Sequence, residues 1–458
     1  MQSPIDITSQ STEALAGVAG QVIVPEDPSY DQARAVFYGG IDKRPSAIVR
    51  VANVADIQRV IAAARDGGYE LAVRSGGHSI AGHSTTDGGL VIDLRSLSKI
   101  EIDAANRTAW VETGATAIHV TEEAAKHGLV VGFGDSGSVG VGGITVAGGI
   151  GFLVRKLGLT IDSVVAAEVV TADGSHLYVD DQRHRDLFWA IRGGGGNFGI
   201  VTRLQFRLHE LRQFTGGILV LPATAETVTG FVNAAANAPE ELSAIGNVMP
   251  APPLPFLPKE LHGKLVIFGM LAYAGDSASA ARALAPFRAL ATPHADMVKE
   301  QPYSAMYPPE DPSYRPSAVA RTMFADGVDR PLAETIIDWL SKSDAVMRVA
   351  QLRVLGGAVS RVPADATAYA HRSQPMLVNV AAFYSTPDER AVRAQWVADF
   401  ARVVQPNDAG AYVGFLGDEG EGRVRSAYPT STWDRLARIK ATYDPANLFR
   451  LNQNVRPA

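Results

Sequence analysis

Apolar residues in the first part of the chain follow the spacing of an amphipathic helix. The spacing i, i+3, i+4, i+7 joins four of them, Ile57, Val60, Ile61 and Ala64. Asn53 precedes this pattern as a candidate N-cap, and Gly67 and Gly68 follow it as a stop signal. The sequence therefore predicts a helix between Asn53 and Gly68.

Short apolar or β-branched runs on both sides of this helix have the length of strands. They occupy residues 47–51, 70–73, 90–94 and 108–111. A second helical pattern covers residues 117–126. We therefore expect residues 30–130 to form a compact α+β unit.

The next segment contains a hairpin signal. Two β-branched runs, VVAAEVVT and SHLYV, flank an Ala-Asp-Gly turn, and Asp-Gly between such runs favours a β-hairpin. A predicted helix at residues 186–191 and a predicted strand at residues 200–208 complete this unit. Residues 132–151, the densest glycine region, have neither a helical nor a strand period.

The composition changes after about residue 213, where glycine becomes sparse and helices alternate with strand-like runs. These runs occupy residues 264–271, 350–354 and 377–383. Near residue 410 the composition again resembles that of the first part of the chain. The predicted division of the chain is a first domain at residues 1–212, a second at 213–410, and a C-terminal segment at 411–458 that returns to the first domain.

Composition and charge exclude several classes of protein. Lys and Arg number 42 and Asp and Glu number 48, giving a net charge of −6 without a basic cluster, which argues against nucleic-acid binding. The sequence contains no cysteine, which excludes disulfides, thiolate metal sites and cysteine nucleophiles. No apolar run approaches the roughly 18 residues of a membrane span, and the N-terminus lacks a secretory pattern. We therefore expect no membrane partner and a cytoplasmic location.

Several short motifs suggest chemistry that their context does not support. GDSGS at residues 134–138 resembles the nucleophile loop of trypsin-like proteases, but the surrounding α+β pattern does not suit a protease barrel. Glycines in residues 194–199 match G-x-G-x-x-G, yet they follow a predicted helix and precede a strand, the reverse of a dinucleotide fingerprint. His78 and His83 have no carboxylate near them in the sequence, so we expect no metal site.

Glycine-rich loops recur in the first domain. They lie at residues 75–82, 137–151 and 193–199. Successive backbone N–H groups in such turns form concave sites for anions. The pattern indicates a large phosphate-bearing cofactor along the loops, and tight turns in an irregular domain are the simpler alternative.

Five motifs together resemble one family. They are RSGGHS, DGGLVIDL, VGVGGITVAGGIGFLVRKLGLTID, DLFWAIRGGGGNFGIVT and YDPANLF, at residues 74–79, 87–94, 139–162, 186–202 and 443–449. Their order and spacing over nearly the whole chain resemble the FAD-linked oxidases of the vanillyl-alcohol-oxidase superfamily, specifically the berberine-bridge-enzyme-like branch. The resemblance implies an α+β fold with a PCMH-type FAD-binding domain, and a substrate domain in which helices flank an antiparallel sheet.

The resemblance assigns the glycine loops to FAD. In relatives the main-chain amides of the first loop wrap the FAD pyrophosphate, and a histidine at the position of His78 bonds covalently to the flavin 8α-methyl carbon. A neutral imidazole nitrogen can add there to an electrophilic methylene tautomer. The cofactor-binding residues implied are His78, which carries the covalent link, and Arg74, Ser75, Gly76, Gly77, Ser79, His83, Ser136, Val139, Gly142, Gly143, Thr145, Gly148, Gly149, Gly151, Phe152, Asn197, Gly199, Ile200, Asn452 and Asn454.

The resemblance also bears on the number of covalent links. Many members of the branch carry a second link from a cysteine before V-G-x-G-G, where this chain has Ser136. Because the sequence has no cysteine, the resemblance implies a single link through histidine, as in the 6-hydroxy-D-nicotine oxidase type. Doubly linked members tend to have open carbohydrate-binding clefts, so a single link favours a smaller or less polar substrate.

The activity implied by the resemblance is oxidation of a C–H bond next to oxygen or nitrogen in a small-molecule alcohol or amine. The substrate carbon delivers hydride to flavin N5, and O2 accepts the electrons to give H2O2. Val139, Val141 and Ile144 lie in the loop that approaches the flavin in relatives, where their size would control oxygen access.

Candidate catalytic groups come from two regions. They are Gln351, Arg353, Asn379 and Tyr384, on or near predicted strands of the second domain, and Tyr412 and Tyr428 in the C-terminal segment. Strand alternation puts Gln351 and Arg353 on one face. Each candidate also has an ordinary structural interpretation. Many relatives have asparagine where this chain has Gly414, so no family role is carried over to that position.

Three alternatives to an oxidase remain open. They are a flavin dehydrogenase with another acceptor, an enzyme of oxidative cyclisation or rearrangement in natural-product biosynthesis, and a non-catalytic FAD-binding protein. Slow reoxidation in air identifies the first and product analysis the second. A flavin that stays oxidised with every donor identifies the third.

Overall fold

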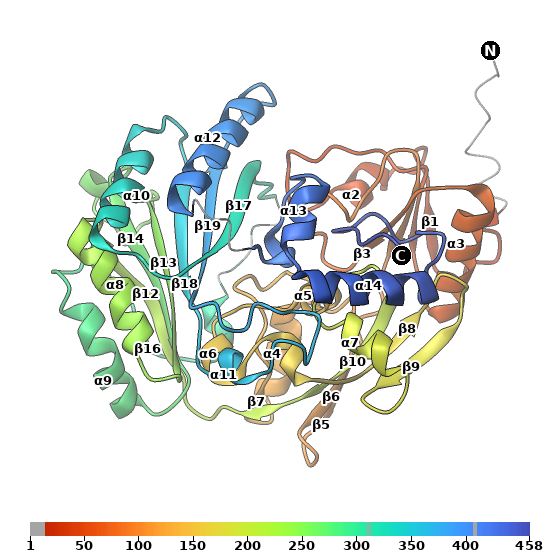
Figure 1. The fold of residues 1–458 in the computed structure, drawn as a ribbon, viewed down its shortest axis with the longest axis horizontal. Helices are drawn as coiled ribbons and strands as arrows, with labels where there is room; N and C mark the ends of the chain where they lie inside the picture. The colour runs from red at the N-terminus through yellow and green to blue at the C-terminus, as the bar shows by residue number, and fades with distance from the viewer. Residues whose placement is uncertain (1–13, 308, 310, 312, 406–409) are drawn as a thin grey trace.

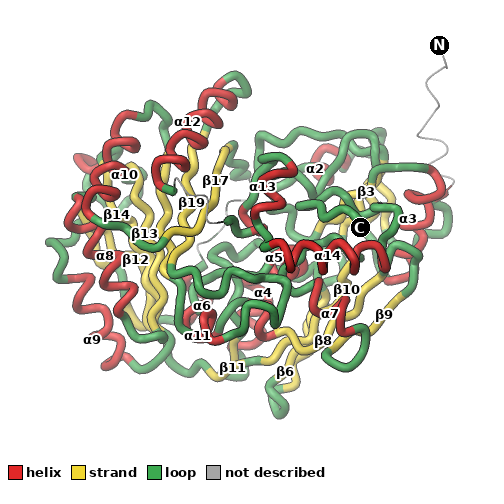
Figure 2. The backbone as a smooth tube through the Cα atoms, viewed as in Figure 1, coloured by secondary structure: helices red, strands yellow, loops and turns green. Residues whose placement is uncertain are grey.

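Two halves of the molecule lie side by side, each built around its own β-structure (Figure 1). The computed structural model describes residues 14–458 except 308, 310, 312 and 406–409. One half contains the N-terminal sheets, and the other contains one large antiparallel sheet with helices on its outer face (Figure 2). This architecture confirms the expected α+β fold with an antiparallel sheet flanked by helices.

The N-terminal sheet has the strand order β1-β2-β4-β3, with β2, β4 and β3 parallel. Its strands are β1 (Gln21–Ile23), β2 (Ala47–Arg50), β3 (Leu71–Arg74) and β4 (Leu90–Asp93). The predicted helix between β2 and β3 is α3 (Val54–Gly67). Asn53 caps it by accepting a hydrogen bond from the N–H of Asp56, and Gly68 ends it in the left-handed conformation with φ 68°.

A second, antiparallel sheet has the order β5-β6-β10-β8-β9. Its strands are β5 (Ile100–Asp103), β6 (Thr108–Glu112), β8 (Val164–Val170), β9 (His176–Asp180) and β10 (Ile200–Arg207). The predicted hairpin is β8–β9, and Gly174 in its turn has φ 87°, a conformation that glycine adopts readily. A short pair joins β7 (Leu129–Val130) to β11 (His209–Glu210).

The glycine-rich region at residues 132–151 contains a helix that its sequence does not predict. This helix, α5, spans Val141–Ala147, with Val141 and Thr145 buried. Glycine disfavours helix in isolation, but packing of the apolar face against the core compensates for the low propensity. The missing helical period in the sequence therefore did not exclude a helix at these seven residues.

The large sheet begins at Thr215 and has the order β15-β12-β14-β13-β18-β19-β17, with β16 paired to β12. Its strands are β12 (Thr215–Pro222), β13 (Leu242–Pro250), β14 (Leu265–Tyr273), β15 (Ala295–Asp296), β16 (Lys299–Glu300), β17 (Ala318–Ala325), β18 (Arg348–Val354) and β19 (Met376–Phe383). The three strand-like runs predicted in this region correspond to β14, β18 and β19.

Helices of the second half pack on the outer face of this sheet and leave its inner face toward the first half (Figure 1). They are α8 (Ala225–Asn237), α9 (Ser277–Arg288), α10 (Arg330–Lys342) and α12 (Glu389–Val404). The other helices are α2 (Tyr30–Arg34), α4 (Ala117–Ala125), α6 (Val154–Leu157), α7 (Arg185–Ala190), α11 (Ala358–Arg361), α13 (Glu421–Ser426) and α14 (Thr430–Tyr443). Short 3-10 helices are η1 (Thr160–Ser163), η2 (Lys259–Leu261), η3 (Tyr303–Met306) and η4 (Val413–Phe415).

The C-terminal segment packs on the first half of the molecule, where α14 contacts α7 (Figure 1). Lys440 is fully buried and its Nζ donates to the carbonyls of Asn197 and Phe449 while pairing with Asp444 at 2.6 Å. The side chain of Asn197 accepts a hydrogen bond from the N–H of Val455. The C-terminal segment, distant in sequence, thus stabilises the glycine-rich loop at residues 193–199.

Membrane insertion finds no support in the helices. Within the described part of the chain, none combines the length and the apolar character that crossing a bilayer requires.

Candidate active site

One cavity lies where the two halves meet. Its volume of about 540 Å³ lies within the range of about 300–1,000 Å³ that is usual for ligand sites. Its walls come from the loop after β3, the glycine-rich segments of the first half, strands β17, β18 and β19, and the segment around η4. Segments far apart in the sequence therefore build a single site.

Hydrogen bonds from Arg74 hold the loop that carries His78. The guanidinium of Arg74 is 1% exposed and donates to the carbonyls of Ser84 and Ala33. Burial lowers the pKa of Arg74 to about 10, so the group stays charged at neutral pH. Gly77 has φ 77°, which lets the chain turn sharply before His78. Arg74 thus shapes the loop and does not itself line the cavity.

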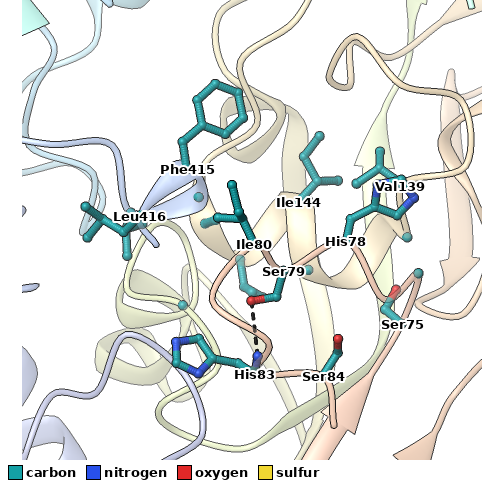
Figure 3. A pocket seen from close by; sticks show the side chains of 18 of the residues that line it. Ser75, His78, Ser79, Ile80, His83, Ser84, Val139, Ile144, Phe415 and Leu416 are labelled. Atoms are coloured by element: carbon teal, nitrogen blue, oxygen red, sulfur yellow. Dashed lines mark hydrogen bonds between the residues drawn. The ribbon is translucent and has the colours of Figure 1, made fainter. Parts of the chain in front are cut away.

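His78 is fixed in orientation by two neighbours. Its ring stacks on Phe37 with ring centroids 4.2 Å apart and planes 19° apart. Its Nε2 lies 2.8 Å from the hydroxyl oxygen of Ser138. Figure 3 shows His78 and Val139 across the cavity from Phe415 and Leu416, which come from the C-terminal segment.

Glycines bring two of the loops into backbone contact and leave room elsewhere. A Cβ on Gly76 would lie 2.2 Å from the backbone N of Gly140, and a Cβ on Gly140 would lie 2.1 Å from the backbone N of Gly76. Gly143 and Gly196 also line the cavity, but a Cβ there would meet no atom within 4 Å. The first pair is required for packing, whereas the second pair leaves backbone open to a ligand.

Unpartnered polar atoms at the same wall fit a long polar cofactor. Within the described residues, His83 Nε2, Ser84 Oγ and Asn452 Oδ1 are buried without a hydrogen-bond partner, and all three residues line the cavity. Buried polar atoms are usually satisfied, so such a cluster indicates groups that a ligand supplies. Together with the open glycine backbone, these atoms fit a phosphate-bearing cofactor such as FAD.

The sheet wall of the cavity carries a chain of polar side chains. Gln351 Nε2 donates to Asn247 Oδ1 at 2.9 Å, and Gln351 Oε1 accepts from Arg353 Nε at 2.8 Å. Arg353 Nη2 in turn pairs with Asp135, which lies in the glycine-rich segment of the other half. The expected placement of Gln351 and Arg353 on one face agrees with this geometry. Asn379 lies directly opposite Gln351 on β19 and also lines the cavity.

The two tyrosine candidates differ in position. Tyr412 lines the cavity, and its hydroxyl oxygen accepts a hydrogen bond from the N–H of Gly149 at 2.9 Å. Burial raises its pKa to about 12, so the phenol is protonated at neutral pH. Tyr428 does not line the cavity; its hydroxyl donates to the carbonyl of Gly193 at 3.2 Å, and burial raises its pKa above the usual range.

Most of the residues singled out from the sequence meet at this cavity. Those that line it are Ser75, Gly76, Gly77, His78, Ser79, His83, Ser136, Val139, Gly142, Gly143, Gly199, Ile200, Gln351, Arg353, Asn379, Tyr412 and Asn452. Those that lie outside the lining are Arg74, Thr145, Gly148, Gly149, Gly151, Phe152, Asn197, Asn454, Tyr384 and Tyr428. Several of the second group hold the lining in place, as Arg74 and Gly149 do.

The structure also brings in residues that the sequence analysis did not single out. Phe37, Tyr38, Asp135 and Phe415 line the cavity. Burial raises the pKa of Tyr38 to about 12. Asp135 belongs to the GDSGS motif. Its position directly before Ser136 could have identified it as a candidate site residue. Nothing in the sequence near Phe37 indicated that it would stack on His78.

Metal binding has no support in the geometry. Over the described residues, no group of three or more potential ligand side chains is arranged to hold an ion.

Comparison with known protein families identifies two segments. The model described as "FAD binding domain" matches residues 45–180, and the model described as "Berberine and berberine like" matches residues 411–456. The first match contains the His78 loop and the whole glycine-rich region at residues 132–151. The second contains the segment that includes Tyr412 and α14.

Relatives match along almost the whole chain. (R)-6-hydroxynicotine oxidase of Paenarthrobacter nicotinovorans is 28% identical, with 96% of this chain and 97% of the relative covered. An uncharacterized FAD-linked oxidoreductase of Bacillus subtilis is 29% identical, with the same coverage. The crystal structure of 6-hydroxy-D-nicotine oxidase from Arthrobacter nicotinovorans superimposes with a TM-score of 0.86 at 26% identity, covering 100% of both chains.

Proposed function

The chain belongs to the FAD-dependent oxidoreductases of the berberine-bridge-enzyme-like branch, and on this premise we propose that it is an oxidase with its flavin attached to His78. It oxidises a C–H bond next to oxygen or nitrogen in a small alcohol or amine. O2 takes up the electrons and is reduced to H2O2.

The observation that carries this proposal is the composition of one cavity. The His78 loop and the open glycine backbone form one wall, and the polar chain on β18 forms another. A cofactor held at the first wall and a substrate held at the second would therefore share one cavity. Sites of this kind bury most of a ligand and orient it with a few polar groups.

The residues that would hold FAD are those with open backbone or unpartnered polar atoms. They are Gly143, Gly196, His83, Ser84 and Asn452, together with His78 as the covalent anchor. Bound FAD supplies the two-electron oxidation chemistry, which amino-acid side chains alone lack.

His78 is suited to act as an anchor because its ring is already oriented. Stacking on Phe37 and the contact with Ser138 restrict its rotation, so little conformational entropy is lost on attachment. Ser136 stands at the position of the second anchor in doubly linked relatives. The proposal is therefore a single link through His78.

On the substrate side, the cavity residues would bind and orient the substrate through an ion pair and neutral side chains. Arg353 and Asp135 form an ion pair, and Tyr38 and Tyr412 are protonated phenols near neutral pH. Such groups offer fixed hydrogen-bond donors to a substrate oxygen or nitrogen. An amine in its neutral form needs no base, whereas an alcohol would have to give its proton to an acceptor such as the Asp135 carboxylate or the neutral His83 imidazole, both of which line the cavity.

The test is acid precipitation of the purified protein combined with intact mass. Wild type should keep its yellow colour in the pellet and be heavier by one FAD. His78→Ala should release all flavin on precipitation. His127→Ala, an exposed histidine after α4, is the matched control and should behave as wild type.

The outcomes separate the alternatives. Release of all flavin by wild type would contradict the covalent link. A covalent flavin that donors reduce but air reoxidises only slowly would contradict the oxidase and favour a dehydrogenase. A flavin that no alcohol or amine donor reduces would favour a binding protein. Peroxide formed with a donor would support the proposal.

A further inference from the structure

The side chain of Arg353 is buried in the sheet wall, and two of its three guanidinium nitrogens have side-chain partners. Arg353 is 3% exposed, its Nε donates to Gln351, and its Nη2 pairs with Asp135. The guanidinium carbon lies 5.1 Å from the centre of the Phe415 ring. Among the described residues, Nη1 is buried without any hydrogen-bond partner. These contacts hold the guanidinium rigidly and leave a single donor group unused.

An unused donor of this kind has an energetic consequence. Leaving a buried donor without a partner costs free energy, and more when the group is charged. Arg353 lines the cavity, so a ligand that brings an acceptor oxygen to Nη1 would remove this cost. The gain is available only to a ligand with an acceptor at that point.

The charge around Arg353 is already balanced. Apart from histidines, Arg353 and Asp135 are the formally charged side chains in the described cavity lining. Burial holds the pKa of His83 down to about 4, so His83 is neutral as well. A carboxylate on the ligand would have to compete with Asp135 for the same guanidinium. The wall therefore favours an uncharged acceptor.

The sheet next to Arg353 offers small apolar side chains. Ala320 on β17 lies opposite Ala381 on β19, and Ala381 lies opposite Val349 on β18. All three line the cavity. The polar side chains beside them on this wall are few, Gln351, Arg353 and Asn379, so most hydroxyls of a sugar would be buried without partners, which is costly. The wall suits an apolar ring or chain instead.

We infer that the substrate is an uncharged, mainly apolar alcohol or amine that places an acceptor oxygen or nitrogen against Arg353 Nη1, with Asp135 setting the preference for neutral over anionic ligands. This inference rests on the proposed function, because it concerns the substrate of the same site. It excludes sugars and carboxylates as preferred ligands.

The test uses three probes on the purified holoprotein. Benzamide is neutral and has an acceptor oxygen, benzoate is its anionic counterpart, and xylobiose is a small sugar. Binding is followed by the visible spectrum of the flavin and, independently, by calorimetry. Benzamide should bind about tenfold more tightly than benzoate, a difference of about 1.4 kcal/mol, and xylobiose should not bind measurably.

Two substitutions test the assigned roles. Asp135→Asn should tighten benzoate binding about tenfold and change benzamide binding little, since the competing carboxylate is gone. Arg353→Gln should weaken benzamide binding about tenfold, as expected for loss of a hydrogen bond from a charged donor. Arg361→Gln, an exposed arginine paired with Glu240, is the control and should bind like wild type.

If Arg353→Gln does not fold, Arg353→Lys keeps the charge and should still weaken benzamide, because ammonium lacks the fixed second donor. Tighter binding of benzoate or xylobiose than of benzamide by wild type would overturn the inference. So would absence of benzamide binding up to its solubility, or unchanged binding by the Arg353 variant. A chain without flavin would refute the proposed function, and calorimetry would still test this inference.

Discussion

His83 shows at the residue scale how burial changes a side chain's chemistry. Burial lowers its pKa to about 4, with a further contribution from Lys43, while Asp418 and Glu70 act in the opposite direction. Its Nε2 is buried without a partner among the described residues. The imidazole is therefore neutral at neutral pH and is an acceptor or donor for a ligand, not a charge.

This pKa predicts a pH dependence of stability. The unfolded chain binds a proton at His83 near pH 6.5, whereas the folded protein resists it down to about pH 4. Between these values the unfolded state holds more protons, so stability falls as the pH falls, by up to about 3 kcal/mol from this group. The measurement is the thermal midpoint of the purified protein from neutral pH to about pH 4.

His83→Gln should make that decline shallower, because glutamine does not titrate. His127→Gln, at an exposed position, should keep the wild-type slope. An unchanged slope in His83→Gln would show that His83 takes up its proton without cost in the folded state.

At the scale of elements, α5 packs on the core with one side and faces the cavity with another. Gly142 on this helix packs on Thr113, where a Cβ would lie 2.9 Å from the Cβ of Thr113. Gly143, one residue on, is exposed in the cavity. Adjacent glycines thus have different surroundings, Gly142 the core and Gly143 the open cavity.

Gly143→Ala should therefore keep the fold and lose cofactor. Alanine favours a helix over glycine by about 0.5–1 kcal/mol, and the added Cβ meets no protein atom within 4 Å. The same Cβ would occupy space that the cofactor needs. The expected result is unchanged circular dichroism with less flavin per chain, measured by absorbance.

Gly422→Ala in α13 is the matched control, since its Cβ also meets nothing within 4 Å and it does not line the cavity. It should keep full flavin content. Full flavin loading of Gly143→Ala would mean that the cofactor does not approach α5 at this point.

At the scale of the whole molecule, buried ionic and polar contacts join the two halves. Arg372 forms two hydrogen bonds of 2.8 Å with Asp162 of η1, and its side chain is 2% exposed. Arg155 of α6 donates to the carbonyls of Leu355 and Ala238. These contacts therefore hold the two halves together.

Arg372→Met should destabilise the protein strongly, because it leaves Asp162 buried without its partner. Breaking one side of a buried pair costs about 3–5 kcal/mol, whereas an exposed pair contributes about 0–1 kcal/mol. Arg361→Met, which removes the exposed pair with Glu240, is the control and should change the thermal midpoint little. Equal effects of the two substitutions would contradict a role of Arg372 in joining the halves.

Much of the local structure followed from the sequence. The cap at Asn53, the β8–β9 hairpin and the strands of the large sheet depend on spacing and turn residues within short segments. The family resemblance rested on motifs that the FAD-binding and berberine-like matches support. The domain boundaries at 212 and 410 and the individual roles of the site residues stay predictions.

The sequence by itself determined the local elements and the cofactor class, because helix caps, turns and glycine-rich loops depend on neighbouring residues. Only the tertiary structure decided which side chains face one another in the cavity. Asp135 and Arg353 are separated by 218 positions, and Phe37 reaches His78 from another loop. Such contacts depend on how distant segments pack, and this packing leaves no periodic signal along the chain.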